Sequence, residues 1–320
     1  MRMSEKLKSN IFFFLAAIIW GFAFVAQCDA GDSMNIFLLL TVRYFLGAVA
    51  LIPIILLFEN RKEKGMSEKP KLKNTVLFGA LCGTILFIAS ALQQWGININ
   101  PNAGKAGFIT GTYTVLVPIF CLILFRQKTG LNVLFGAICA VAGLYLLSVQ
   151  DGIGSISIAD IILFLGAVFW TFHIITIDRC ISRVSALKFS SMQFFTCAAL
   201  SFLSMLISGN TDFGVLGEQI ANSLWPLLYM GIFSSGVGYT CQALGQRGAD
   251  PTYSAIILST ESVFAAIGGV IFGIDKGMNL RSYIGCAVIF IGIILSQVSF
   301  KDLFKRKSKS KRNNPKRPHP

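Results

Sequence analysis

The sequence has few charged residues. Asp, Glu, Lys and Arg make up 13% of its 320 residues, about half of the roughly 25% that is typical of a soluble domain. Hydrophobic residues make up 54%. A chain with this composition does not have enough polar side chains to cover a globular surface. We therefore exclude an ordinary soluble domain and expect a protein whose surroundings are mostly lipid.

The sequence also lacks the motifs of common enzymes and metal sites. It contains only two histidines and no HExxH, GxSxG or P-loop pattern. None of its eight cysteines forms a CxxC pair, and most lie inside apolar runs, so neither a zinc site nor a disulfide framework is expected. We predict no catalytic residues, no metal ligands and no cofactor, and we do not expect an enzyme.

Long apolar segments, in contrast, are abundant. A transmembrane helix needs about 20 mostly apolar residues, and ten segments approach this length: 10–28, 34–58, 74–96, 102–124, 131–149, 159–181, 186–208, 223–247, 251–273 and 279–299. Lipid offers no partner to exposed backbone groups, so each segment should be helical. The predicted fold class is an all-α membrane protein with ten transmembrane helices.

The basic residues predict how these segments are oriented. With the N-terminus in the cytoplasm, most Lys and Arg lie in the inner connectors, whereas the outer side holds only Lys105, Lys276 and Arg281. The outer connectors instead carry acids such as Asp29 and Asp151. This is the positive-inside pattern, and it predicts a multi-pass cell-membrane protein with both termini in the cytoplasm.

Residues 300–320 form a basic tail that accounts for much of the net charge of +13. The stretch KRKSKSKRNNPKRP resembles a nuclear-localisation or RNA-binding tract. Because the rest of the chain is so apolar, we expect this tail to contact anionic lipid instead, and we expect no nucleic-acid partner. The sequence predicts no oligomeric state.

Two pairs of segments resemble each other at a spacing of about 150 residues. FFLAAIIWGFAFV, which contains Trp20, matches LFLGAVFWTFHII, which contains Trp170; the segment that begins at Leu131 matches the one that begins at Leu280. A duplicated unit of five spans, an odd number, enters the membrane from opposite sides, as in many secondary transporters. We predict two inverted repeats, 1–149 and 159–299, followed by the tail.

Several blocks resemble a known family. WGFAFV at Trp20, the Arg43-Tyr44 pair, LQQWGININPNAGKAGFITGTYTVLVPIF from Leu92 and GVGYTCQALGQRGADPTYSAIILSTESVFAAIGG from Gly236 are similar to the EamA type of the drug/metabolite transporter superfamily. The resemblance implies ten helices in two inverted five-helix repeats around a central substrate cavity. It also implies transport of small metabolites across the cell membrane, often as export. Where this family branch often has Pro after the acid of its ninth helix, the chain has Ser262.

Two charged residues fall inside predicted spans. Glu261 lies about 15 Å along its helix, near the midplane, where a charge costs roughly 2.5–3.5 kcal/mol. Its carboxyl either serves a proton or cation site or makes a packing hydrogen bond, for example with Ser259. Arg43 cannot lose its proton, so it either contacts a substrate carboxylate, pairs with Glu261, or tethers a neighbouring helix.

Other polar and aromatic residues near mid-depth are candidates for the cavity wall. A packing role is the alternative for Trp20, Trp170 and His173, and interfacial anchoring is the alternative for Gln94. These candidates are Trp20, Trp170, Gln94, Thr110, Tyr113, Thr114, His173, Tyr239 and Gln242.

The sequence therefore predicts a secondary transporter that moves a small organic metabolite by alternating access. Export and proton coupling are hypotheses that the sequence leaves open. A passive channel or facilitator, and a membrane-embedded enzyme, are the two alternatives.

Overall fold

The computed structural model describes residues 5–59, 71–127, 129–148, 157–209, 212–247, 249–275, 277 and 279–297. Within these ranges the chain forms helices and no strand. In order they are α1 (Glu5–Gly31), α2 (Ile36–Ile54), η1 (Ile55–Glu59), α4 (Leu72–Ile99), α5 (Ala103–Gly111), α6 (Tyr113–Phe125), α7 (Leu131–Ser148), α8 (Ile158–Cys180), η2 (Ile181–Arg183), α9 (Ala186–Ile207), α10 (Phe213–Asn222), α11 (Leu224–Leu228), η3 (Tyr229–Gly238), α12 (Tyr239–Gly245), α13 (Pro251–Leu258), α14 (Glu261–Ile271) and α15 (Leu280–Gln297). The basic tail, and the ends of the two predicted repeats at 149 and 299, lie outside the described residues.

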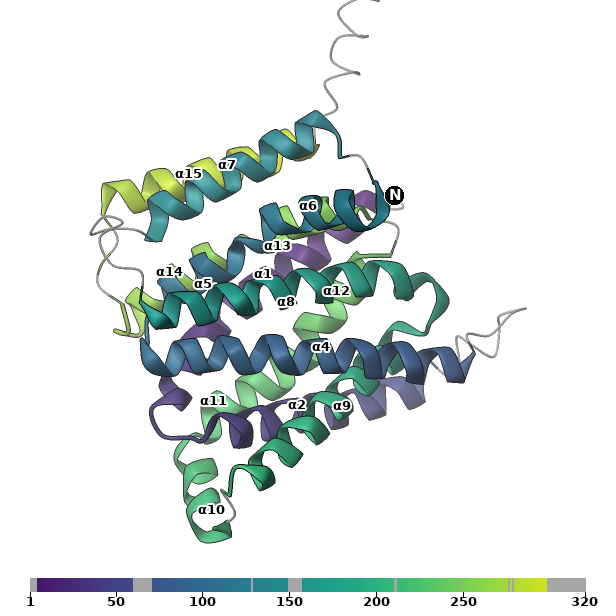
Figure 1. Ribbon diagram of the computed structural model, residues 1–320, viewed down its shortest axis with the longest axis vertical. Helices are drawn as coiled ribbons and strands as arrows, with labels where there is room; N and C mark the ends of the chain where they lie inside the picture. Colours follow the sequence, from purple (N-terminus) through teal and green to yellow (C-terminus); the bar gives the residue numbers. More distant parts are fainter. Residues whose placement is uncertain are drawn as a thin grey trace, which may run out of the picture.

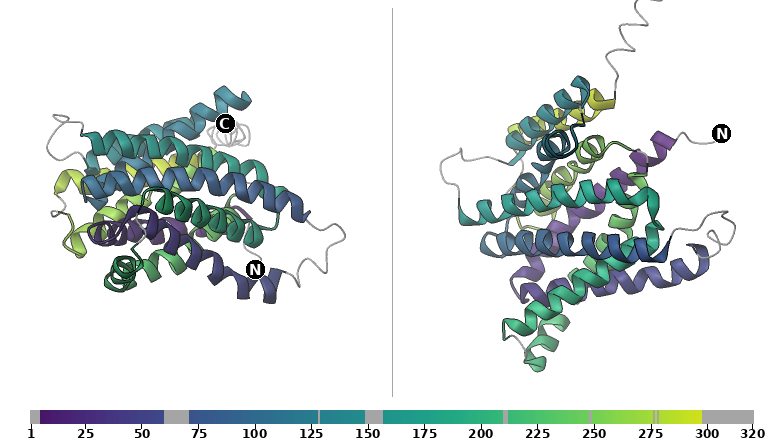
Figure 2. Two further views of the ribbon diagram at one scale, coloured as in Figure 1. Left: turned by 60° about the horizontal axis from the view of Figure 1, so that its bottom comes forward. Right: turned by 45° about the vertical axis from the view of Figure 1, so that its right-hand side comes forward.

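Most of the long helices run in roughly the same direction and form one bundle (Figure 1). Helices α7 and α15 lie side by side at one end of its long axis, and the short α10 lies at the other end. The right-hand view of Figure 2 keeps α7 and α15 together at the edge of the bundle. The remaining helices lie between these two ends, and they include all those that line the cavity described below.

Seven helical segments in the described part of the chain are long and apolar enough to cross a membrane: Glu5–Gly31, Ile36–Leu57, Leu72–Ile99, Ala103–Phe125, Ile158–Arg183, Ala186–Ile207 and Pro251–Ile271. Leu131–Leu146 and Tyr283–Ser296 are shorter apolar helices. Large apolar side chains such as Leu77, Ile123 and Ile207 point outward and are exposed. An apolar outer surface on helices whose backbone groups are satisfied internally suits contact with lipid.

The predicted segments coincide with helical stretches, but several of them are not single α-helices. The segment 34–58 ends in the π-helical η1. The segments 102–124 and 251–273 are each broken near their middle, and 223–247 contains the π-helical stretch η3. The sequence also did not predict α10, which follows the cap residue Asp212. Pro118 lies within α6, and the break in the segment 102–124 lies earlier, at Thr112.

Both breaks have the same local feature, a threonine hydroxyl that donates to a carbonyl of its own helix. At the first break, the Thr112 hydroxyl donates to the carbonyl of Ile109 at 2.6 Å. At the second, the Thr260 hydroxyl donates to the carbonyl of Ile257 at 2.7 Å. Hydroxyl groups that bond to carbonyls of the preceding turn compete with the helical hydrogen bonds there. Thr112 and Thr260 are 148 residues apart (260 − 112), so the breaks fall at equivalent positions of the predicted repeats.

The two broken helices cross and are joined by a reciprocal pair of hydrogen bonds. Ser262 on α14 donates to the carbonyl of Gly107 on α5 at 2.6 Å. Thr114 on α6 donates to the carbonyl of Ala255 on α13 at 3.4 Å. The two donor residues are 148 residues apart in the sequence, and so are the two acceptor residues. A β-carbon on Gly107 would lie 3.0 Å from that of Ala265, so the glycine allows the close approach that its GxxxG spacing with Gly111 predicts.

Helices α7 and α15 contact each other in the same reciprocal way. A β-carbon on Gly143 would lie 2.6 Å from the carbonyl oxygen of Gly285, and one on Gly136 would lie 2.7 Å from that of Gly292. Gly136 and Gly143 match Gly285 and Gly292 at an offset of 149 residues. Gly136 therefore contacts Gly292, the equivalent of Gly143, and Gly143 contacts Gly285, the equivalent of Gly136. Exchanged contacts of this kind are typical of an interface with two-fold symmetry.

Replacing Gly143 by Ala should weaken this contact. The added methyl group would meet backbone atoms of α15, and overpacking of this kind costs about 1–3 kcal/mol. We expect a lower melting temperature of the purified protein in detergent. Gly217→Ala is the matched control, because a β-carbon on Gly217 has no neighbour within 4 Å. Equal melting temperatures for the two variants would contradict the packing described here.

Candidate functional site

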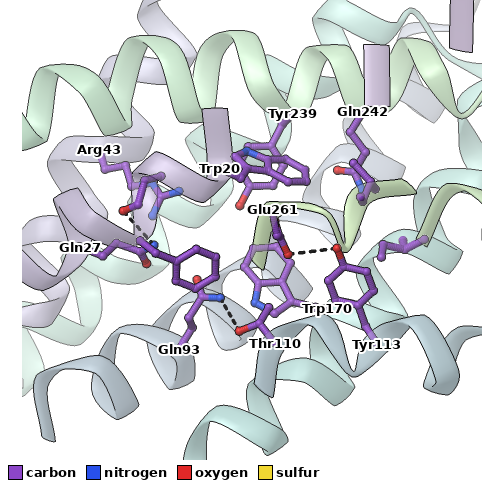
Figure 3. A pocket seen from close by; sticks show the side chains of 14 residues that line it. Trp20, Gln27, Arg43, Gln93, Thr110, Tyr113, Trp170, Tyr239, Gln242 and Glu261 are labelled. Atoms are coloured by element: carbon purple, nitrogen blue, oxygen red, sulfur yellow. Dashed lines mark hydrogen bonds between the residues drawn. The ribbon is translucent and has the colours of Figure 1, made fainter. Parts of the chain in front are cut away.

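A cavity of about 40 Å³ lies where the two broken helices cross (Figure 3). A buried polar space of roughly 10–15 Å³ already holds one water molecule, so this cavity has room for a few waters, and it must widen to admit an organic metabolite. Its lining residues come from α1, α2, α4, α5, α6, α8, α12, α13 and α14: Trp20, Ala23, Phe24, Gln27, Arg43, Gln93, Thr110, Tyr113, Trp170, Ile174, Tyr239, Gln242, Leu258 and Glu261.

The acid of the cavity is held by a residue from the other broken helix. Glu261 is 4% exposed, and its carboxyl accepts a hydrogen bond from the Tyr113 hydroxyl at 3.0 Å. Each of the two residues is the first of the helix that follows a break, and they are 148 residues apart. The expected bond to Ser259 is not formed, since the Ser259 hydroxyl donates to the carbonyl of Ile256 instead.

Three aromatic rings form one wall of the cavity. The ring of Tyr239 lies 4.7 Å from that of Trp20 and 6.1 Å from that of Trp170, measured between centroids. The indole N–H of Trp20 donates to the carbonyl of Ser234 in η3 at 3.1 Å. The indole nitrogen of Trp170 is buried and has no hydrogen-bond partner among the described residues. The two tryptophans thus lie against the same tyrosine, but only one of them is tied to the backbone.

The buried guanidinium of Arg43 contacts hydroxyl groups. Its Nη2 donates to Ser234 at 3.0 Å and its Nε to Ser235 at 3.3 Å. It also lies over the ring of Tyr44, with 5.1 Å between the guanidinium carbon and the ring centroid. The hypothetical pair of Arg43 with Glu261 is not formed in this structure, since none of the ion pairs in the described ranges includes Arg43.

Of the two neighbouring glutamines on α4, the cavity is lined by Gln93 and not by the predicted Gln94. Gln94 does not line the cavity; its amide donates to the carbonyl of Gln27 at 3.0 Å and to Asn98 at 2.8 Å. The neighbouring Gln93 lines the cavity and donates to the Thr110 hydroxyl at 3.0 Å. Successive residues on a helix differ by about 100° in direction, so an error of one position turns a cavity residue into a packing residue.

Two further predicted residues lie behind the cavity wall. Thr114 is buried in the crossing of α6 with α13. His173 is buried against the rings of Trp170 and Tyr239 and lies 3.1 Å from the amide oxygen of Gln193 on α9. Neither residue lines the cavity. The structure thus places both residues in contacts between helices, and their role in binding stays a prediction.

The other eight predicted residues all line the cavity: Glu261, Arg43, Trp20, Trp170, Thr110, Tyr113, Tyr239 and Gln242. The structure brings them together from both predicted repeats, and their role in binding stays a prediction. Sequence reasoning missed Gln27 and Gln93 as cavity residues. Gln27 lies seven residues, two helical turns, after Trp20 on α1, and this spacing was the available signal.

Comparisons with known proteins agree on one family. The sequence profile of the EamA-like transporter family matches residues 7–149 and again residues 157–297. An uncharacterized transporter of Archaeoglobus fulgidus is 27% identical, with 91% of this chain and 86% of that protein aligned. A WAT1-related protein of Arabidopsis thaliana is 27% identical over 82% of this chain and 79% of its own length.

The fold has a solved counterpart. A protein crystal structure superposes with a TM-score of 0.71 over 91% of this chain and 98% of the other chain. Its sequence identity of 17% means that this likeness shows the fold alone.

Replacing Tyr113 by Phe should destabilise the protein. The substitution removes the donor to the buried Glu261 carboxyl, and an unsatisfied buried polar group costs about 1–3 kcal/mol. Thermal unfolding can be followed with a thiol-reactive dye, because six of the eight free cysteines are buried. Tyr283→Phe, at a residue that is 61% exposed, should melt like the unsubstituted protein. If both variants melt alike, the bond to Glu261 contributes nothing to stability.

Proposed function

Because this chain belongs to the EamA-like transporter family, we propose that it is a secondary transporter that moves a small organic metabolite across the cell membrane by alternating access. The two profile matches confirm the predicted family, and they support a membrane transporter. The observation that carries the proposed mechanism is the small polar cavity at the crossing of the two broken helices, lined from both matched halves. Binding sites between repeats are typical of secondary transporters.

The proposed architecture is ten membrane spans in two inverted five-helix repeats. Its support is the set of reciprocal contacts between positions 148 or 149 residues apart, namely the Ser262–Gly107 and Thr114–Ala255 bonds and the glycine contacts of α7 with α15. Reciprocal contacts arise when two similar units are related by a two-fold axis. When each unit has an odd number of spans, that axis lies in the membrane plane.

In the proposed orientation, both termini and the basic tail are cytoplasmic. The support is the distribution of Lys and Arg in the sequence and the tendency of basic connectors to stay inside. Anionic lipid is the proposed contact of the tail. The proposed direction is export, as the family resemblance implies.

Proton coupling through Glu261 is part of the proposed mechanism. The carboxyl is buried in the cavity, and among the described residues its one hydrogen-bond partner is Tyr113. The other titratable or charged groups that line the cavity are Arg43, Tyr113 and Tyr239, and His173 lies behind Tyr239. A carboxyl at a bilayer midplane is more stable neutral than charged, so taking up and releasing a proton would accompany its exposure to each side.

The two alternatives predict different experiments. A carrier shows trans-stimulation, in which unlabelled substrate on one side accelerates exchange of labelled substrate from the other, whereas a passive channel does not. A membrane enzyme would convert its substrate chemically, and the Tyr113 hydroxyl near Glu261 is the ionisable neighbour that such an enzyme would need. Metabolite profiling of medium and cytosol, with and without overproduction of the protein, identifies the compound for these assays.

Glu261→Gln should separate proton movement from substrate movement. In liposomes that contain the purified protein, we expect the variant to retain substrate counterflow and to lose substrate-driven proton flux, measured with a pH-sensitive dye. The amide keeps the size and the hydrogen-bonding capacity of the acid but cannot release a proton in this range. Glu218→Gln, at an exposed position on α10, is the matched control. An unchanged proton flux in Glu261→Gln would remove Glu261 from the coupling mechanism.

The orientation is testable with single cysteines. Asn100 and Ser182 are exposed in connectors at the ends of α4 and α8. In a variant without native cysteines, Asn100→Cys should react with a membrane-impermeant maleimide in intact cells. Ser182→Cys should react only after permeabilisation. Labelling of both positions from the same side would contradict the proposed threading.

A further inference from the structure

The cavity contains a buried cation that has no acidic partner in the described part of the chain. Arg43 is 3% exposed, and its two hydrogen bonds go to the neutral hydroxyls of Ser234 and Ser235. A guanidinium keeps its charge in proteins and has more N–H donors than these two bonds use. A buried charge is costly unless a charge of opposite sign accompanies it. The site is therefore suited to an anion that is not part of the protein.

Glu261 does not supply that negative charge by direct contact. It accepts its hydrogen bond from Tyr113 and forms no ion pair with Arg43. In Figure 3, Arg43 and Tyr113 lie toward opposite sides of the view, with Glu261 between them. The Tyr44 ring beneath the guanidinium stabilises a cation by its quadrupole but does not neutralise it.

Two further polar atoms of the lining also lack partners among the described residues. These are the indole nitrogen of Trp170, a donor, and the amide oxygen Oε1 of Gln242, an acceptor. The two residues are 9% and 1% exposed, respectively. Buried polar groups without partners are rare in proteins and call for an explanation. A ligand that carries both an acceptor and an O–H or N–H donor would satisfy both atoms.

We propose that the substrate is a small organic monocarboxylate that also carries an O–H or N–H donor, and that Arg43 is the residue that selects its charge. This inference rests on the proposed transport function and names its substrate class. Arg43 is the one basic residue among the described residues that line the cavity, so it neutralises a single negative charge. A carboxylate matches the planar guanidinium.

The rest of the cavity fits such a molecule. The rings of Trp20, Trp170 and Tyr239 offer an apolar wall for its carbon skeleton. Gln242 accepts from its O–H or N–H group, and Trp170 donates to one of its oxygens. Ser234 and Ser235 are positioning residues, since they hold the guanidinium and do not themselves line the cavity.

Binding of matched ligands to the full-length protein tests this proposal. The probes are 2-hydroxy and 2-amino carboxylates with side chains from methyl to benzyl, each paired with its carboxamide. Binding is read from tryptophan fluorescence, because Trp20 and Trp170 line the cavity. We expect at least one carboxylate to bind. Its carboxamide, and the same carboxylate with Arg43→Gln, should each bind about 10- to 100-fold more weakly, the effect of a lost charge-assisted hydrogen bond.

Control variants make the result specific. Arg183→Gln removes an equal charge at an exposed position and should leave carboxylate affinity unchanged, and Arg43→Lys should retain part of it. If Arg43→Gln does not fold, the proposal is tested by comparing the affinities of each carboxylate and its carboxamide for the unsubstituted protein. The proposal is overturned if no carboxylate binds, or if carboxamides bind as well as carboxylates.

Failure of the transport function would look different from failure of this inference. Binding that selects carboxylates and depends on Arg43, without trans-stimulated uptake into liposomes, would reject the carrier and keep the anion site. Trans-stimulated uptake of a compound without a carboxylate that is equally fast with Arg43→Gln would keep the carrier and reject the anion site.

Discussion

The structure depends on the crossing of two helices that are broken at the same level. In lipid, backbone groups released by a break have no water to bond with, so the protein must satisfy them itself. Here the hydroxyls of Thr112 and Thr260 bond to carbonyls within their own helices, and Ser262 and Thr114 bond to carbonyls of the other helix. The breaks are thus tolerated because each helix donates a hydrogen bond to a backbone carbonyl of the other.

This crossing positions the chemistry of the cavity. The residue that follows each break begins a new helix, and the two residues in these positions, Tyr113 and Glu261, meet in a hydrogen bond. The helices around the crossing then supply the walls: aromatic rings from α1, α8 and α12, amides from α1, α4 and α12, and one guanidinium from α2. A polar cavity inside an otherwise apolar bundle follows from the geometry of the two breaks.

The sequence predicted the helical segments, the family and most of the cavity residues, because these depend on strong and additive signals. Apolar length marks the segments, and an acid or a guanidinium in such a segment must face inward. The same reasoning failed where a single helical position decides the outcome. It selected Gln94, whereas Gln93 lines the cavity. It also did not predict the break at Thr112. The rotation of a helix about its own axis decides which of its residues face the cavity. This rotation is set by packing against neighbouring helices, which the pattern of a single sequence does not show.

The hydrogen bond between Tyr113 and Glu261 joins equivalent positions of the proposed repeats, yet a phenol occupies one position and a carboxyl the other. A rotation that exchanged the two halves would reproduce the backbone at this point but not its chemistry. Under the proposed symmetry, the forms open to opposite sides of the membrane are therefore unequal in energy. In the proposed carrier, these two residues at the centre of the bundle would give one of the two forms the lower energy even in the absence of a gradient.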